Sequence, residues 1–182
     1  MPKALIVWRW EQKVLYNFIT DDEYNSIVED ILNHEEFQKT KDINHHGLNR
    51  YDHSLRVSYY SYKIAKKLHI GYEEVARAGL LHDFFLVNSK DITIKEKMNT
   101  LVNHPKYAKA YSEKFFDLND KEKDIIVSHM FPIAPTRIPK YAESWLVDLV
   151  DDYVAVREQL HVRRRQIFRL ANFIFALMIS ID

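Results

Sequence analysis

Cysteine is absent from the 182 residues of this chain. Disulfides and thiolate metal sites are therefore excluded, and any bound metal must use imidazole or carboxylate ligands. The absence also fits a cytoplasmic location, which is our expectation for the chain. The apolar run from Met1 to Trp10 lacks the length and the cleavage site of a signal peptide.

Glycine and proline are scarce, with three and five residues respectively. So few turn-forming residues predict long helices joined by short connections, and hence an all-α domain. Neither sign of charge is in excess, because 26 Lys and Arg residues balance 26 Asp and Glu residues. We therefore expect no general attraction to nucleic acid polymers or to acidic membranes. The hydrophobic fraction of 47% is typical of a soluble globular protein.

The chain does contain a histidine and an aspartate side by side in an apolar segment, Leu80-Leu81-His82-Asp83-Phe84-Phe85. Burying two ionisable side chains without partners is costly. A metal ion is the strongest candidate for the group that stabilises them. The pair therefore directs attention to other histidines and carboxylates that could complete a metal site.

Helical periodicity and capping signals divide the chain into successive helices. The apolar run over residues 4–19 fits a strand or a helix, and we favour a helix. A capping box formed by Asn119 and Glu122 is expected to begin the helix that carries His129. The other helices are expected at residues 20–34, 51–68, 72–87, 105–116 and 143–160.

His53 begins a helical stripe that we expect to face the core. The other residues of the stripe follow at intervals of three or four: Val57, Tyr60, Ile64 and Leu68. A single histidine in such a position is more often a hydrogen-bonded core residue than a metal ligand. Two further histidines, His104 and His129, strengthen the metal interpretation, and the residues around each predict its place on a helix.

His104 precedes Pro105 and is expected at the N-cap of the helix that follows, since proline is favoured in the first turn. His129 follows Ile125 and Ile126 at intervals of four and three, so it continues their apolar face. His129 is therefore expected to point toward the interior, as His53 is.

Together these residues resemble the HD-domain superfamily of metal-dependent phosphohydrolases, over about residues 48–160. Five short motifs carry the resemblance: Arg50-Tyr51-Asp52-His53-Ser54, Ala78-Gly79-Leu80-Leu81-His82-Asp83, Asn103-His104-Pro105, Ser128-His129-Met130 and Leu149-Val150-Asp151-Asp152-Tyr153. It implies a single-domain, all-α helical bundle of the HD-domain type at 48–160. Residues 1–47 would form an N-terminal helical segment packed on the core, and residues 161–182 a basic and apolar C-terminal helix.

The resemblance also implies a metal centre and a reaction. Asp83 would bridge one ion to a second, and the cofactor would be one or two divalent transition-metal ions: Fe, Mn, Zn, Co or Ni. Asp83 and His82 would be the catalytic residues, acting on a small phosphate ester or anhydride, with a nucleotide as the expected substrate. The metal ligands would be His53, His82, Asp83, His104, His129 and Asp151.

The last ligand has three candidates within five residues, Asp148, Asp151 and Asp152. Asp151 matches the aspartate of the family's closing motif. Helical phase alone favours Asp152, which lies nearer the stripe that contains Leu149 and Tyr153. Asp148 is the third choice, and the sequence leaves the three open.

The residues after Asp83 depart from the family pattern. Many members continue with Ile-Gly-Lys, whose lysine can contact phosphate, whereas this chain has Phe84-Phe85-Leu86. Phosphate charge must then be met elsewhere, and the candidates are Arg50, Lys90 and Arg137. The missing lysine also supports an alternative, a catalytically inactive HD-type protein that senses nucleotides or acts as a scaffold.

The C-terminal segment places three arginines, Arg163 to Arg165, before an apolar run from Ile167 to Ile181. This run is too short to span a bilayer, which takes roughly 20 residues. Three interpretations follow, in order of preference: a core helix, a contact with a second copy of the chain, and a peripheral membrane anchor.

Overall fold

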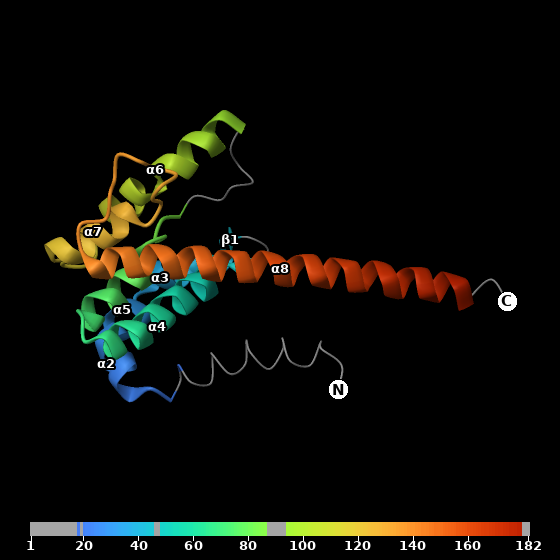
Figure 1. The fold of residues 1–182 in the computed structure, drawn as a ribbon, viewed down its shortest axis with the longest axis horizontal. Coiled ribbons are helices and arrows are strands. Elements are labelled where there is room, and N and C mark those ends of the chain that lie inside the picture. The colour runs from blue at the N-terminus through green and yellow to red at the C-terminus, as the bar shows by residue number, and fades with distance from the viewer. Residues whose placement is uncertain (1–17, 19, 46–47, 87–93, 180–182) are drawn as a thin grey trace.

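The computed structural model describes residues 18, 20–45, 48–86 and 94–179 (Figure 1). The helix favoured over residues 4–19 lies outside this part of the chain, apart from Phe18. The regular elements of the described part are helices, except for one antiparallel pair of two-residue strands. In chain order its elements are α2 (Asp22–Leu32), α3 (Glu35–Gln38), the 3-10 turn η1 (Lys39–Asp42), β1 (Asn44–His45), β2 (Leu48–Asn49), α4 (Arg50–Leu68), α5 (Tyr72–Leu81), α6 (Ile94–Ser112), α7 (Asp120–Ser128) and α8 (Ala142–Ile179).

Helices α4 and α5 form the centre of the bundle, and the first part of α8 lies beside them (Figure 1). Helix α2 packs against α5, and α7 packs against α5, α6 and α8. The expected all-α fold is therefore confirmed. The largest side chains that are fully buried between these helices include Tyr24, Phe37, Tyr62, Leu80, Leu81, Phe84, Ile125 and Ile126.

The close contact of α4 and α5 depends on Gly79. A Cβ atom at this position would lie 2.7 Å from the Cα of Ser58 on α4. Ser58 also ties the two helices together, because its hydroxyl group donates to the carbonyl oxygen of Ala76 at 2.6 Å. Gly79 is three residues before His82, so this contact sets the position of α5 just before the His82-Asp83 pair.

Two predicted helix boundaries are wrong at the residues that matter most for the site. Helix α5 ends at Leu81 rather than near residue 87, so His82 is its C-cap and Asp83 lies in the turn beyond. His104 is not an N-cap, because α6 begins at Ile94 and continues through Pro105. Pro105 has no backbone N–H group, so one hydrogen bond of the helix is missing there, and α6 continues on both sides of it.

The inward stripe predicted for α4 is correct only in its first half. His53 and Val57 are buried, but Ile64 and Leu68 are 39% and 60% exposed. The first half of α4 is enclosed by α5 and α8, so it buries polar residues such as Arg56 and Ser58 as well as apolar ones. His53 therefore lies in an interior that surrounds the helix on several sides.

The two helices expected on either side of residue 160 form one helix, α8, of 38 residues. Its first part packs on α4, α5 and α7, and its C-terminal part extends beyond the bundle (Figure 1). Ile167 and Phe168 are 65% and 58% exposed, so the core-helix interpretation is wrong for the side chains described there. Among the described residues, no helix is both long and apolar enough to cross a membrane.

Candidate metal centre

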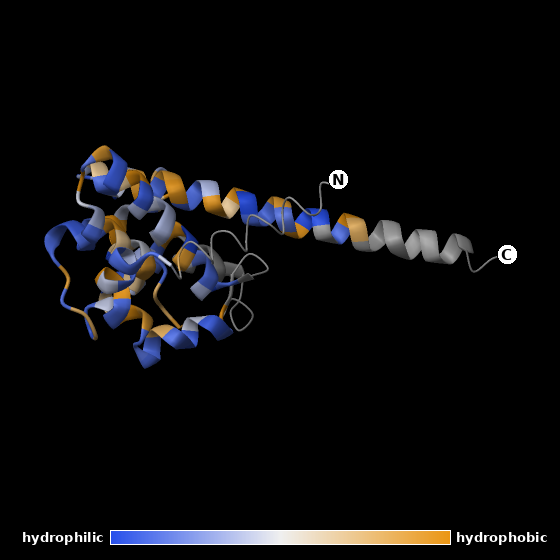
Figure 2. Cartoon of the chain, turned by 90° about the horizontal axis from the view of Figure 1, so that it is seen from below, coloured by the Kyte–Doolittle hydropathy of each residue, from blue (hydrophilic) through white to orange (hydrophobic). Residues whose placement is uncertain are grey.

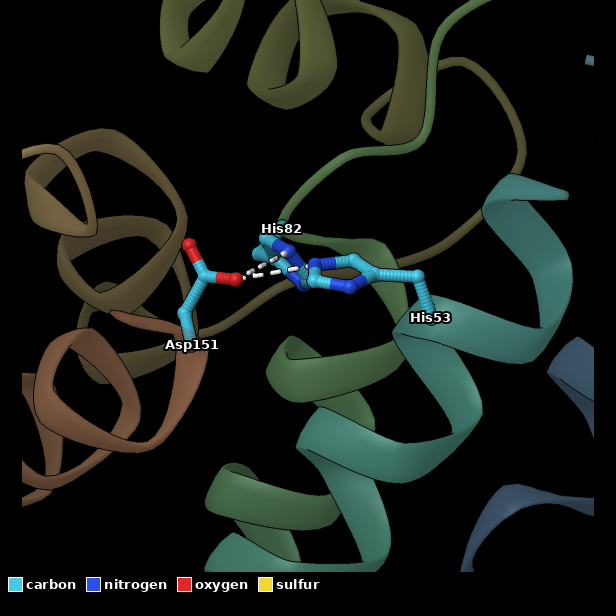
Figure 3. Close-up of side chains that lie close together, drawn as sticks. All are labelled: His53, His82 and Asp151. Atoms are coloured by element: carbon cyan, nitrogen blue, oxygen red, sulfur yellow. Dashed lines mark hydrogen bonds and ion pairs between the residues drawn. The ribbon is translucent and has the colours of Figure 1, made fainter. Parts of the chain in front are cut away.

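His53, His82 and Asp151 converge in the interior from three different segments (Figure 3). His53 comes from the first turn of α4, His82 from the C-cap of α5, and Asp151 from α8. One carboxylate oxygen of Asp151 lies 2.8 Å from Nε2 of His53 and 3.7 Å from Nε2 of His82. Ligand atoms bound to one transition-metal ion lie roughly 3 to 3.5 Å apart, because each metal–nitrogen bond is about 2 Å. The three residues are therefore spaced as metal ligands.

The hydrogen bonding of His82 leaves one of its two ring nitrogens to face the site. Nδ1 lies 2.8 Å from the carbonyl oxygen of Gly79, which can only accept, so Nδ1 carries the proton. Nε2 is buried and has no hydrogen-bond partner among the described residues. A buried ring nitrogen without a hydrogen-bond partner is costly, and a cation between it and the Asp151 carboxylate would satisfy both groups. The donor set of His82 and Asp151 thus fits a divalent metal ion.

A second group of ligands joins the first through His82. Ligand atoms of His82, Asp83 and His129 all lie within 4.8 Å of one another. Nδ1 of His129 donates to the carbonyl oxygen of Ile126, so its Nε2 also faces the site with a lone pair. Nε2 of His104 lies 2.8 Å from this atom and 3.2 Å from Oδ1 of Asp83.

The structure therefore brings together all six residues expected as ligands. They form two adjacent groups, and Asp83 stands between His82 on one side and the His104–His129 pair on the other. Each group consists of imidazole and carboxylate donors, which suit divalent transition metals.

Glu158 and Arg56 support the site from behind His53, and sequence reasoning missed both. Oε2 of Glu158 lies 2.9 Å from Nδ1 of His53, and its other oxygen accepts from Arg56 at 2.8 Å. Carboxylates in this position fix the tautomer and orientation of metal-binding histidines. The signal was present in the sequence, because Glu158 lies seven residues, or two helical turns, after Asp151.

Burial and neighbouring charges shift the pKa values within the two groups in opposite directions. Burial alone would lower the pKa of His53, but the carboxylates of Asp151 and Glu158 raise it to about 10. Burial, followed by the neighbouring His82 and His104 rings, lowers the pKa of His129 to about 3. The carboxylates therefore favour a positive charge at His53, in the position where a bound cation would stand, and the second group keeps a neutral imidazole at His129.

The other two aspartates on α8 do not join these groups. Asp152 is exposed, and Asp148 is buried but belongs to neither cluster of candidate ligands in the described part of the chain. Burial, followed by the charges of Asp152 and Asp151, raises the pKa of Asp148 to about 7. Of the three candidates, the geometry favours Asp151.

The three candidate phosphate-binding residues differ in their placement. Arg50 is buried, and its Nε atom lies 3.9 Å from Oδ2 of Asp83. Its guanidinium group stacks over the ring of Phe85 at 3.8 Å and donates to the carbonyl oxygen of the same residue. Arg137 donates to Asn103, the residue before His104, at 3.1 Å. Lys90 lies outside the described residues.

Comparison with known proteins identifies the family. The family model described as "HD domain" matches residues 50–156, a range that contains every candidate ligand. No curated protein and no solved structure matches the chain. The family model spans more than half of the sequence, from the turn before His53 to the turn after Asp151. This chain belongs to the HD-domain family.

Proposed function

We propose that the protein is a metal-dependent phosphohydrolase that acts on a small phosphate ester or anhydride, with a nucleotide as the expected substrate. The observation that supports this most is the buried Nε2 of His82, which has no hydrogen-bond partner in the described part of the chain and lies between Asp151 and the Asp83–His129 group. Membership of the HD family supports the same chemistry.

The six candidate ligands would hold one or two divalent ions. When bound, such ions supply an activated water as nucleophile and neutralise phosphate charge. Asp83 would orient that water; one of its oxygens lies 3.2 Å from Nε2 of His104, and the other lies 3.9 Å from Nε of Arg50. Glu158 holds His53 in the orientation that directs Nε2 toward the site.

Arg50 is the residue best placed to meet phosphate charge in place of the lysine that many family members have. Its Nε has no hydrogen-bond partner among the described residues and lies beside Asp83. Phe85, which stands two residues after Asp83, supports the planar guanidinium group through stacking. The apolar sequence after the doublet thus positions an arginine that comes from α4.

The test is phosphate release by the full chain after reconstitution with Mn, Fe, Co, Ni or Zn, measured on nucleoside mono-, di- and triphosphates and simple phosphomonoesters. We expect at least one metal to support turnover, and Asp83→Asn or His82→Ala to reduce it by about a thousandfold or more. His69→Asn is the matched control, because His69 is exposed at the end of α4.

The alternative, an inactive nucleotide-sensing or scaffolding protein, makes a different prediction in the same experiment. Such a protein would bind nucleotide when loaded with metal, for example by calorimetry, and would release no phosphate from any substrate. Binding without turnover across every metal would therefore reject the phosphohydrolase and favour the sensor.

A further inference from the structure

Helix α8 carries a row of exposed apolar side chains on the face opposite the metal centre. Leu149, Tyr153, Val156 and Leu160 are between 50% and 62% exposed. Val154 and Glu158, which lie between them in the sequence, are almost fully buried. Successive helical residues turn by about 100°, so the exposed row and the buried ligand face lie on opposite sides of the helix. We name this row the α8 stripe.

The spacing of the α8 stripe continues along the helix beyond Leu160. Its members are spaced by four and three residues in alternation, and Ile167 continues the pattern beyond the bundle at 65% exposure. Figure 2 shows hydrophobic residues recurring along α8 both beside the bundle and beyond it. In the sequence the same spacing reaches Leu170, Ile174 and Leu177. A seven-residue apolar repeat over about four heptads, here with one polar break at Arg163, is the pattern of a coiled coil.

We propose that the α8 stripe binds the α8 stripe of a second copy of this chain, and that the two helices run parallel. The repeat is self-complementary, as a two-fold interface requires. The stripe faces away from α4 and α5, so these two helices leave it open to a partner. The helix is also long enough, since 38 residues extend over about 57 Å.

Charge beside the stripe favours the parallel arrangement. Asp152 and Arg157 lie on its two flanks, five residues apart, and both are exposed. In a parallel coiled coil, flanking residues with this spacing pair between chains, so Asp152 of each copy would face Arg157 of the other. In an antiparallel pairing, residues of the same flank face each other. Arg157 and Arg164 lie on one flank, so arginines of the two copies would face and repel each other. Arg163 interrupts the stripe once, and its long side chain can reach solvent.

Pairing would also couple the two faces of α8. Asp151 and Glu158 lie on the turns that carry Tyr153, Val156 and Leu160 on the other side. A partner that rigidifies these turns would hold the candidate ligand and its supporting carboxylate in place. The pairing itself does not depend on the proposed reaction, so its test needs no activity.

The first test is the molecular mass of the full chain in solution, measured by sedimentation velocity over a range of concentrations. We expect a dimer, and we expect Val156→Lys to raise its dissociation constant by at least about tenfold, because a charge would be buried in the interface. Leu68→Lys is the matched control, since Leu68 is an apolar residue of α4 with 60% exposure outside the stripe. Circular dichroism verifies that both variants stay folded.

The second test uses the absence of cysteine, which makes any introduced thiol unique. In the parallel pair, Val156 faces Val156 of the other copy, so Val156→Cys should form a disulfide-linked dimer on mild oxidation, and Leu68→Cys should not. A monomer at every concentration, a dimer unaffected by Val156→Lys, or a chain that is monomeric but sediments with lipid vesicles would overturn the proposal. A dimer in which Val156→Cys fails to cross-link would overturn its parallel form.

Discussion

Glu158 and Asp151 hold the two nitrogens of the His53 ring from opposite edges, at 2.9 Å from Nδ1 and 2.8 Å from Nε2. Both carboxylates come from α8, two helical turns apart, whereas His53 comes from α4. With Nδ1 donating to Glu158, Nε2 is the nitrogen that faces Asp151 and His82. Several predictions about the site depend on this relationship and on the packing around it.

Replacing Glu158 should weaken metal binding without removing a ligand. We expect Glu158→Gln to lower the affinity for a divalent transition metal by about 10- to 100-fold, because the His53 ring loses its carboxylate support. Isothermal titration of the metal-free chain measures the change. Glu143→Gln is the control: Glu143 is also a buried carboxylate of α8, but it accepts from Gly71 and Lys121, away from the ligands. Equal affinities for the two variants would contradict the proposed support.

The choice among the three aspartates of α8 can be decided by substitution. Asp151→Asn should abolish stoichiometric binding at the group formed with His53 and His82, because an amide oxygen is a far weaker ligand than a carboxylate. Asp152→Asn should leave binding unchanged, since Asp152 is exposed. Metal content after gel filtration gives the comparison. Loss of metal in the Asp152 variant alone would reverse our assignment.

The metal-free protein should lose stability as the pH falls, in part because of His129. Its folded pKa of about 3 is below the ordinary value of 6.5, so between these values the unfolded chain binds a proton that the folded chain does not. Stability from this residue is therefore present above pH 6.5 and is lost as pH falls toward 3. His129→Gln should reduce the slope of the free energy of unfolding against pH by up to about 1.4 kcal/mol per pH unit.

The comparison uses urea titrations between pH 4.5 and 7.5 with a metal chelator present. Other groups contribute equally to both proteins, so the difference in slope isolates His129. Identical slopes would show that His129 binds its proton over the same pH range in the folded and unfolded states.

The contact between α4 and α5 predicts a difference between two glycines. Gly79→Ala should destabilise the fold by about 1 to 3 kcal/mol, because its Cβ would lie 2.7 Å from the backbone of Ser58. Gly71→Ala should cost less, since its Cβ would meet the ends of flexible side chains such as Glu74 and Lys121. Midpoints of urea unfolding provide the measurement, and equal losses would argue against close helix packing at Gly79.

The helical periodicity of the sequence was sufficient to predict much of the fold. Helix α4 begins one residue before the predicted start, and the capping box of Asn119 and Glu122 forms at the start of α7. These features depend on local signals. The helical phase around Asp152 was misleading, because it identified the exposed stripe of α8 rather than the buried face with Asp151.

Other features depend on contacts between distant segments and were not predictable locally. The end of α5 at Leu81 brings His82 and Asp83 into a turn, where their side chains meet ligands from α6, α7 and α8. Pro105 suggested a helix start, but α6 continues through it. Residue 160 carries no signal for a break, and α8 continues past it, so the predicted boundary before residue 161 falls within a helix.

The most direct test of the metal centre is the metal content of the purified chain after reconstitution with Mn, Fe, Co, Ni or Zn. We predict that elemental analysis finds at least one equivalent per chain, and that His82→Ala, which removes the nitrogen shared by the two ligand groups, loses most of it. His69→Asn should retain the metal of the unmodified chain. A folded chain that takes up none of the five metals, or equal metal content in His82→Ala and the unmodified chain, would contradict the account.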